Sequence, residues 1–384
     1  MKKILLSIAI FASALTTQAQ TWNMVVTTAD GQTVEVKQAD VKNIVFRADD
    51  QNADQVLIKE VYNGGVMNPE TNKNYQYDKS ITLYNNCGQV AVLNNLCVGM
   101  AFQSNAEAAA NSKLYKDGVL VYENEDFIPA FHGIWYFPNS LVIQPYSQVV
   151  VNIHGAIDNT QTVPASVNYA NKDYYCMYDP EYGGGGNSAG NNFYNNTSYY
   201  PAPADVIPTS HYLKTVKYGM GNAWTFSVLS PAVFIFQTQG VSPKEHAENA
   251  DNIWYADGVQ QTSVFTSIKV KKEWVIDGVE VFNAAKLADC KKRFSADIDA
   301  GHVDLTNQLG HSLYRNVDKE ATEALPENSG KLVYNYALGV DNSTDPSGID
   351  AEASMKNGAH IIFQDTNNST NDFHERQKCS LRGE

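Results

Sequence analysis

The side chains most able to bind a metal ion form two short runs late in the sequence. Residues 341–348 and 365–372 both alternate Asp with Asn, Ser and Thr, and Ca²⁺ favours such oxygen ligands. Neither run has the spacing of an EF-hand loop, and Pro346 stands where that loop needs Gly. We therefore interpret both runs as Asx turns without a metal. No cofactor is expected, and calcium is the alternative.

A second chemical feature is a stretch rich in tyrosine and asparagine at residues 168–208, which also contains the run Gly183-Gly184-Gly185-Gly186. It lacks apolar periodicity, so it cannot be a core element. Tyrosine beside adaptable Asn and Ser is typical of binding loops, and aromatic faces suit sugars and proteins alike. The alternative is a lid that buries its rings on the protein's own surface. The candidate ligand-binding residues are Tyr174, Tyr175, Tyr178, Tyr182, Tyr194, Tyr199 and Tyr200.

Other arrangements give little support for catalysis. His302 and His311 could approach each other on adjacent strands with Asp304 between them. A catalytic or metal site needs a third group that the sequence does not identify, so structural histidines are the preferred interpretation. The sequence has no nucleophile elbow, zinc-protease helix, phosphate loop or dinucleotide fingerprint.

The cysteines indicate at most a sparse set of disulfides. Five cysteines in 384 residues do not make a disulfide-dense scaffold. Cys87 and Cys97 are the candidate pair, because they fall on successive predicted strands joined by a turn. An odd number leaves at least one free thiol.

The N-terminus and the charge balance indicate export and narrow the class of partner. Lys2 and Lys3 precede an apolar run that ends in Thr17-Gln18-Ala19, so residues 1–19 are predicted to be a cleaved signal peptide. The first cysteine is Cys87, so a lipoprotein is not expected. The chain has 28 basic and 42 acidic residues and a net charge of −14, which argues against nucleic acid as a partner. No stretch is apolar enough to span a membrane, so membrane insertion is not expected.

The elements expected to position these residues are mostly strands. Residues 20–50 form a small N-terminal unit, in which Asp30-Gly31 marks a hairpin turn. Asp277-Gly278 predicts another hairpin within residues 275–281, and helices are expected at 105–115 and 283–294. The other strands are predicted at 57–61, 81–84, 90–93, 96–102, 133–137, 141–143, 149–153, 216–218, 223–228, 233–237 and 263–270.

Six segments, taken in order, resemble the lamin-tail-like family of domains. They are residues 56–62 (VLIKEVY), 81–86 (ITLYNN), 90–93 (VAVL), 141–151 (LVIQPYSQVVV), 310–315 (GHSLYR) and 365–373 (DTNNSTNDF). The resemblance covers residues 54–379, with residues 168–208 as an insertion. The pattern also resembles a family of exported Bacteroidetes proteins whose function is not established. Thr82 departs from the family's usual Glu, and Tyr146-Ser147 from its usual Gly.

The resemblance implies an all-β fold, an immunoglobulin-like (lamin-tail-like) β-sandwich with long insertions, preceded by the small hairpin unit. In the family this fold serves interaction more often than catalysis. Short polar side chains would hold irregular turns, Phe373 would anchor its segment to the core, and Arg315 could pair with Asp365 or Asp372. The structural motif residues are Ser312, Arg315, Asp365, Asn367, Asn368, Asp372 and Phe373.

The function that these observations favour is that of an exported, non-catalytic binding or assembly protein of the bacterial cell envelope. Its partner would be an envelope protein or an extracellular glycan, in the periplasm, at the cell surface or outside the cell. The alternative is a metal-assisted hydrolase acting on polysaccharide or phosphoester, with acidic residues as base or metal ligands.

Overall fold

The computed structural model describes residues 22–41, 49–75, 77–101, 104–182, 201–218, 230–261 and 265–382. The predicted signal peptide at residues 1–19 lies outside them. The chain divides into two compact units, residues 1–46 and residues 47–384. In the first unit β1 (Asn23–Thr27) pairs antiparallel with β2 (Thr33–Lys37), so the hairpin around Asp30-Gly31 is confirmed. A short 3₁₀ helix, η1 (Gln38–Asp40), follows.

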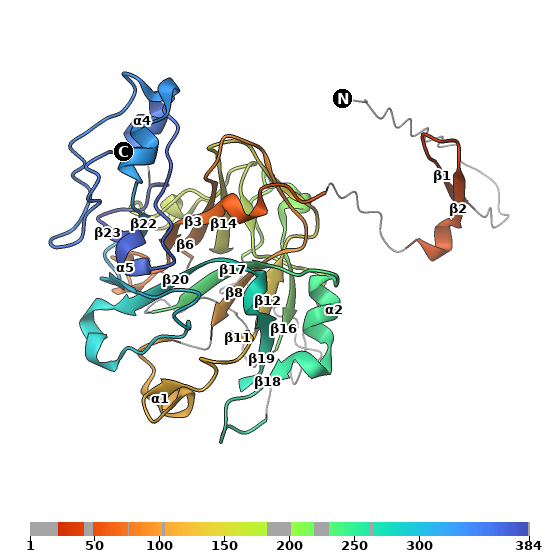
Figure 1. Cartoon of the computed structure of the whole chain (residues 1–384), viewed down its shortest axis with the longest axis horizontal. Coiled ribbons are helices and arrows are strands. Elements are labelled where there is room, and N and C mark those ends of the chain that lie inside the picture. The colour runs from red at the N-terminus through yellow and green to blue at the C-terminus, as the bar shows by residue number, and fades with distance from the viewer. Residues whose placement is uncertain are drawn as a thin grey trace. The chain divides into compact units, whose positions relative to one another are not determined.

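Two large sheets form the second unit (Figure 1), and the fold is an all-β sandwich. The first sheet has nine strands and is antiparallel except where β20 and β21 pair in parallel. Its main path runs β18 (Ile253–Trp254), β19 (Ser267–Lys271), β11 (Phe127–Phe131), β8 (Leu96–Ala101), β17 (Ala232–Gln237), β20 (Val275–Asn283) and β21 (Val303–Leu305), while β12 (Gly133–Tyr136) pairs with β8 and with β16 (Lys214–Lys217).

The second sheet has six strands and places the C-terminal motifs beside the first predicted strands. Its order is β15 (Tyr175–Cys176), β14 (Gln148–His154), β6 (Lys79–Asn85), β3 (Val56–Tyr62), β22 (Ser312–Arg315) and β23 (Phe373–Arg376). Short pairs complete the unit: β4 (Met67–Asn68) with β5 (Lys73–Asn74), β7 (Ala91–Leu93) with β13 (Leu141–Ile143), and β9 (Tyr115–Lys116) with β10 (Val119–Leu120).

The helices of the described residues are short and lie between strands. They are α1 (Ala108–Leu114), α2 (Pro243–Glu248), α3 (Lys319–Glu323), α4 (Ala351–Lys356) and α5 (Ser369–Asp372). The 3₁₀ turns of this unit are η2 (Ala53–Gln55), η3 (Asn159–Gln161), η5 (Thr209–His211), η6 (Ala250–Asn252), η8 (Lys272–Trp274), η9 (Ala284–Asp289) and η10 (Pro326–Asn328). In Figure 1 the C-terminal segment, in blue, carries α4, and α5 lies next to β23.

The main core lies between the two sheets. Ile58 and Leu83 from the six-stranded sheet share one buried cluster with Val98, Val233 and Val281 from the nine-stranded sheet. Apolar side chains at alternate positions of a strand reach the same face, which is why these runs close a sandwich. Removal of this apolar surface from water is the main term that stabilises the fold.

The outer faces of both sheets are covered as well. On the six-stranded sheet, Leu57 and Tyr84 pack with Ile361 and Phe363 of the C-terminal segment. On the nine-stranded sheet, Phe234 packs with residues that include Ala247 of α2. All residues of β3, β6, β8 and β17 are therefore buried.

Two predicted elements near residue 280 are wrong. Asp277-Gly278 is not a turn, because β20 continues through it and pairs with β17, with a register shift just before Asp277. The ring of Phe294 lies 3.1 Å from where a Cβ of Gly278 would be, so the glycine permits close packing. The predicted helix at 283–294 is replaced by the end of β20 and by η9, within which Lys286 has non-helical backbone angles. Glu280 holds the following segment, because its carboxylate accepts the backbone N–H groups of Arg293 and Phe294.

The predicted disulfide is also wrong, since Cys87 and Cys97 are both free. Cys97 lies in β8 and is buried in the outer cluster of the nine-stranded sheet. Cys87 follows β6 in the other sheet, where its thiol contacts Asn85 and Gln89. Cys87 therefore follows a strand of one sheet, whereas Cys97 lies in a strand of the other.

Candidate binding site beside the Arg315 network

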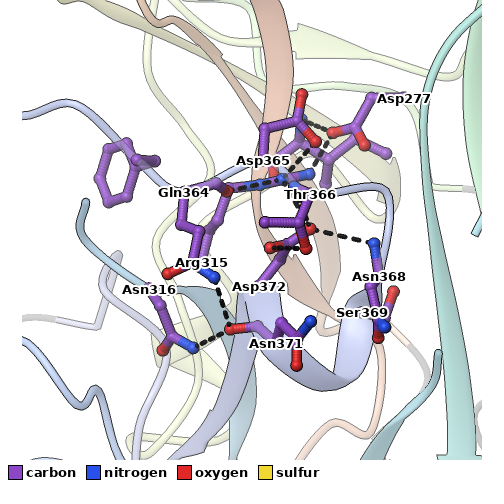
Figure 2. A network of polar contacts seen from close by, with 12 residues as sticks. Asp277, Arg315, Asn316, Gln364, Asp365, Thr366, Asn368, Ser369, Asn371 and Asp372 are labelled. Carbon is purple, nitrogen blue, oxygen red and sulfur yellow. Dashed lines mark hydrogen bonds and ion pairs between the residues drawn. The ribbon is translucent and has the colours of Figure 1, made fainter. Parts of the chain in front are cut away.

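Arg315 is the centre of a buried polar network that joins the two sheets. Its side chain is 1% exposed, and it forms an ion pair with Asp277 of β20. Its Nε donates a hydrogen bond to the carbonyl oxygen of Ile58 in β3 at 2.9 Å. Asp277 in turn accepts the backbone N–H of Ile58 at 2.6 Å. The guanidinium therefore connects β22, β3 and β20 across the sandwich (Figure 2).

Two further carboxylates approach Arg315 from the segment before β23. Nη1 lies 3.3 Å from Asp365 Oδ1 and 3.9 Å from Asp372 Oδ2. These are the two partners that the sequence suggested. The sequence does not indicate Asp277 as a partner, because Asp277-Gly278 predicts the tip of a hairpin there.

Burial governs the protonation of this network. Desolvation raises the pKa of Asp277 to about 6, although Arg315 opposes the shift. Burial also disfavours the charge on Arg315, but its pKa is raised because Asp277, Asp365 and Asp372 surround it. These charged groups therefore interact with one another and with backbone groups.

The remaining motif residues hold their own turns. Asp372 accepts the backbone N–H groups of Thr366 and Asn368 at 2.9 and 3.2 Å. Asn368 is the N-cap of α5 and accepts the N–H of Thr370. Asn367 adopts a φ of 52°, a left-handed conformation that asparagine tolerates better than most residues.

Two more motif residues contact neighbouring strands. Ser312 donates to Glu60 in β3 at 2.6 Å. Phe373 is 4% exposed, and its ring centroid lies 4.5 Å from the guanidinium carbon of Arg315. Both contacts anchor the C-terminal strands to the sandwich.

The oxygen-rich runs considered for calcium use their buried carboxylates internally. Asp345 accepts the backbone N–H groups of Val317 and Ser347 at 2.9 and 2.8 Å. Asp372 is occupied as described above. Within the part of the chain that the structure describes, no group of three or more His, Cys, Asp or Glu side chains is placed to hold a metal ion.

His302 and His311 do not form a shared site in the structure. His302 Nε2 lies 3.7 Å from Asp304, whereas His311 Nδ1 lies 2.7 Å from Glu375. The ring of His302 also stacks on Phe282. Each histidine has its own partner, as expected for structural histidines.

The described tyrosines of the 168–208 stretch pack against the sandwich. Tyr174 packs on a cluster that contains Tyr62 and Tyr169, and the ring of Tyr175 stacks on His211 with centroids 4.1 Å apart. These contacts fit the lid alternative rather than an open binding loop.

Two further rings of the stretch behave in the same way. Tyr178 meets Tyr212 edge to face, and the hydroxyl of Tyr182 donates to the carbonyl oxygen of Lys217 at 2.5 Å. Three candidate residues and the glycine run lie outside the described residues: Tyr194, Tyr199, Tyr200 and residues 183–186.

A pocket of about 400 Å³ lies beside the Arg315 network. It is formed by the segments around residues 342–346 and 364–374, together with Asn316 just after β22. Figure 2 shows Asn316, Gln364 and Asn371 side by side at this place. The lining residues are Asn316, Asn342, Ser343, Thr344, Pro346, Gln364, Thr370, Asn371, Phe373 and His374.

The lining of this pocket carries no formal charge. Burial lowers the pKa of His374 to about 3, so its imidazole is neutral near pH 7. Its Nδ1 lies 2.7 Å from the amide oxygen of Asn316 and its Nε2 lies 2.7 Å from the hydroxyl of Tyr336. Because an amide oxygen only accepts, Nδ1 carries the proton and Nε2 accepts from Tyr336.

Hydrogen bonds between side chains and the backbone join the walls of the pocket. Asn316 Nδ2 donates to the carbonyl oxygen of Asn371 at 2.7 Å, and the backbone N–H of Glu375 donates to Ser343 Oγ at 2.8 Å. The neighbouring carboxylates of Asp345 and Asp372 are turned to the backbone. The lining also includes the exposed side chains of Asn342, Thr344 and Asn371, and amides and hydroxyls can both donate and accept hydrogen bonds.

The two oxygen-rich runs supply much of this lining. In the sequence they stand out because of their carboxylates, which do not line the pocket. It missed the role of Asn316, Asn371 and His374 in the pocket. The usable signal was the high amide and hydroxyl content of the same two runs. What the sequence does not show is that they meet beside β22.

Fold and site together define a β-sandwich protein with an uncharged polar pocket. A family model described as "Protein of unknown function (DUF4876)" matches residues 144–380, and the chain belongs to this family. It is similar in fold to the crystal structure of a DUF4876 family protein from Bacteroides thetaiotaomicron VPI-5482 at 2.50 Å resolution, with a TM-score of 0.56 and 16% identity over 92% of this chain and 81% of the other. No curated protein matches the chain.

Among the described helices, none is long and apolar enough to cross a membrane.

Proposed function

We propose that this chain is an exported, non-catalytic binding protein of the cell envelope, and that the uncharged pocket holds a neutral sugar unit of an extracellular glycan. The observation that carries this proposal is the lining of amides and hydroxyls, beside carboxylates that are turned away. A sugar presents hydroxyl groups that donate and accept, so such a lining can match it group by group.

The neighbouring chemistry favours binding over turnover. A glycosidase needs two carboxyl groups that flank the bond to be cleaved. Here Asp345 and Asp372 accept backbone N–H groups, and Asp365 pairs with Arg315. None of these carboxylates lines the pocket.

One feature of the sequence and one of the structure support the rest of the proposal. The positive and apolar start of residues 1–19 supports export. The lamin-tail-like assignment is supported by the way β3, β6, β14 and β22, which contain resembling segments, come together in one sheet.

The experiment is a glycan-array screen of residues 20–384 with three variants. Asn371→Ala and Thr344→Ala each remove an exposed polar group from the pocket. We expect each to weaken a specific hit by about tenfold, the effect of about 1.4 kcal/mol. The matched control is Asn357→Ala, an exposed asparagine that does not line the pocket, which should bind as the wild type does.

Three results would overturn the proposal. One is a hit that all three variants lose equally, and another is no hit on a broad array. The third is release of reducing sugar from a bound glycan, which would instead favour the hydrolase.

A further inference from the structure

A second pocket of about 400 Å³ lies in the C-terminal segment, and it shares no lining residue with the uncharged pocket. Its walls come from α4 and from the chain between Arg376 and Arg382. The cationic side chains of Lys356, Lys378, Arg376 and Arg382 line it. In a chain with a net charge of −14, four cations around one pocket are a local reversal of charge.

Arg376 is the unusual member of this group. It is 4% exposed, and its Nε is buried without a hydrogen-bond partner. Its guanidinium rests on the ring of Tyr314 at 4.8 Å. Among the described residues, no carboxylate oxygen lies within 4.0 Å of its guanidinium. An arginine this deeply buried normally has a paired carboxylate or a set of carbonyl acceptors.

The carboxylates near Arg376 are already occupied. Glu352 lies 2.7 Å from Lys59 Nζ and accepts the hydroxyl of Tyr314 at 2.7 Å. Asp350 caps α4 by accepting the N–H of Ala353 at 3.0 Å. Both line the pocket, yet neither neutralises Arg376 directly.

Glu60 is engaged in the same way. It accepts the hydroxyl of Ser312 and the backbone N–H of Ser380 at 2.6 and 2.9 Å. Burial disfavours the charge on Arg376, but Glu60, Tyr314, Tyr336 and Glu352 raise its pKa overall. The guanidinium is therefore charged and buried, and its Nε lacks an acceptor.

We infer that this pocket is a binding site for an oxyanion, a carboxylate or phosphate group, held by the guanidinium of Arg376 with Lys378 at its side. Such groups have two oxygens that fit the planar fork of arginine, and the resulting charge-assisted hydrogen bonds are among the strongest in proteins. The ligand would supply oxygen acceptors to the guanidinium of Arg376, which lines the pocket.

The test is calorimetric titration of residues 20–384 with sodium phosphate and, separately, with sodium acetate, at constant ionic strength. We expect saturable binding of at least one ion, with a Kd on the order of 1 mM or tighter. Binding of phosphate alone would indicate a phosphate ester as the source of the group, and binding of acetate alone a carboxylate.

Variants locate the site. Arg376→Lys keeps the charge but loses the fork, so binding should weaken about tenfold. Lys378→Ala should weaken it about threefold. The matched control Lys244→Ala removes an exposed lysine of α2 and should bind as the wild type does.

The inference is overturned if neither ion binds saturably up to about 20 mM, or if Lys378→Ala and Lys244→Ala bind equally well. The melting temperature of each variant is measured first. Should Arg376→Lys fail to fold, the wild-type isotherm and the comparison of the two lysine variants still decide.

Discussion

Arg315 and Arg376 are residues of the same type on adjacent strands of one sheet, and their surroundings differ. Arg315 has Asp277, Asp365 and Asp372 around it, whereas Arg376 rests on the ring of Tyr314. The first arginine therefore joins the two sheets, and the second lines the pocket proposed to bind an oxyanion. The sequence allowed the partners Asp365 and Asp372 to be predicted because they lie in one short polar run. It did not reveal Asp277, which reaches Arg315 only after two sheets have packed.

The Arg315 network predicts a large loss of stability when the cation is removed. Arg315→Met would leave Asp277 buried without its counter-charge, and such a break costs about 3–5 kcal/mol. The measurement is the free energy of unfolding in urea. Asp365→Asn is the control, because Asp365 is 39% exposed and its loss should cost no more than about 1 kcal/mol. A cost for Arg315→Met equal to that of the control would contradict the assigned role.

Two Asp-Gly pairs show when a local sequence pattern predicts a hairpin turn correctly and when it does not. Asp30-Gly31 turns the chain, with Gly31 at a φ of 86° and open space around it. Asp277-Gly278 lies inside a strand, because Asp277 bonds to Ile58 and Gly278 makes room for Phe294. The same dipeptide therefore has opposite roles, and only tertiary contacts decide between them.

The strand β11 was missed for a related reason. Its sequence contains Pro129, and proline lowers the expectation of a strand since it cannot donate to the ladder. In the structure Pro129 lies opposite Lys269 of β19, while Ala130 pairs with β8 on the other side. The apolar residues on either side of the proline still fill the core, so packing outweighs the lost donor.

The packed part of the tyrosine-rich stretch gives a prediction at this scale. Tyr175→Ala removes a ring that stacks on His211 and packs near Phe137. We expect a loss of about 2 kcal/mol in the free energy of unfolding, less than for a fully buried ring. Tyr334→Ala, at a side chain that is 45% exposed, should change it by no more than about 0.5 kcal/mol. Equal effects in the two variants would mean that Tyr175 does not hold the stretch to the sandwich.

For the whole molecule, the class of fold was predictable because strands with apolar runs and turn residues dominate the sequence. The two-sheet core, with Ile58 and Leu83 facing Val98 and Val233, follows from that pattern. The second layer was not predictable. Residues such as Ile361 and Phe363 cover the outside of β3 and β6, and this placement depends on where a segment with little regular structure comes to rest. Both pockets are built from that covering segment, so the sequence alone did not locate them.

Glycan binding in the uncharged pocket is tested by a titration of the side-chain amide signals of ¹⁵N-labelled protein with the best glycan from the array. We expect the amide signals of Asn316, Gln364 and Asn371 to shift in proportion to saturation, while that of Asn357 stays in place. Shifts confined to residues around Tyr182, with the pocket amides unchanged, would contradict binding in the pocket. They would instead indicate that the glycan binds at the tyrosine-rich stretch.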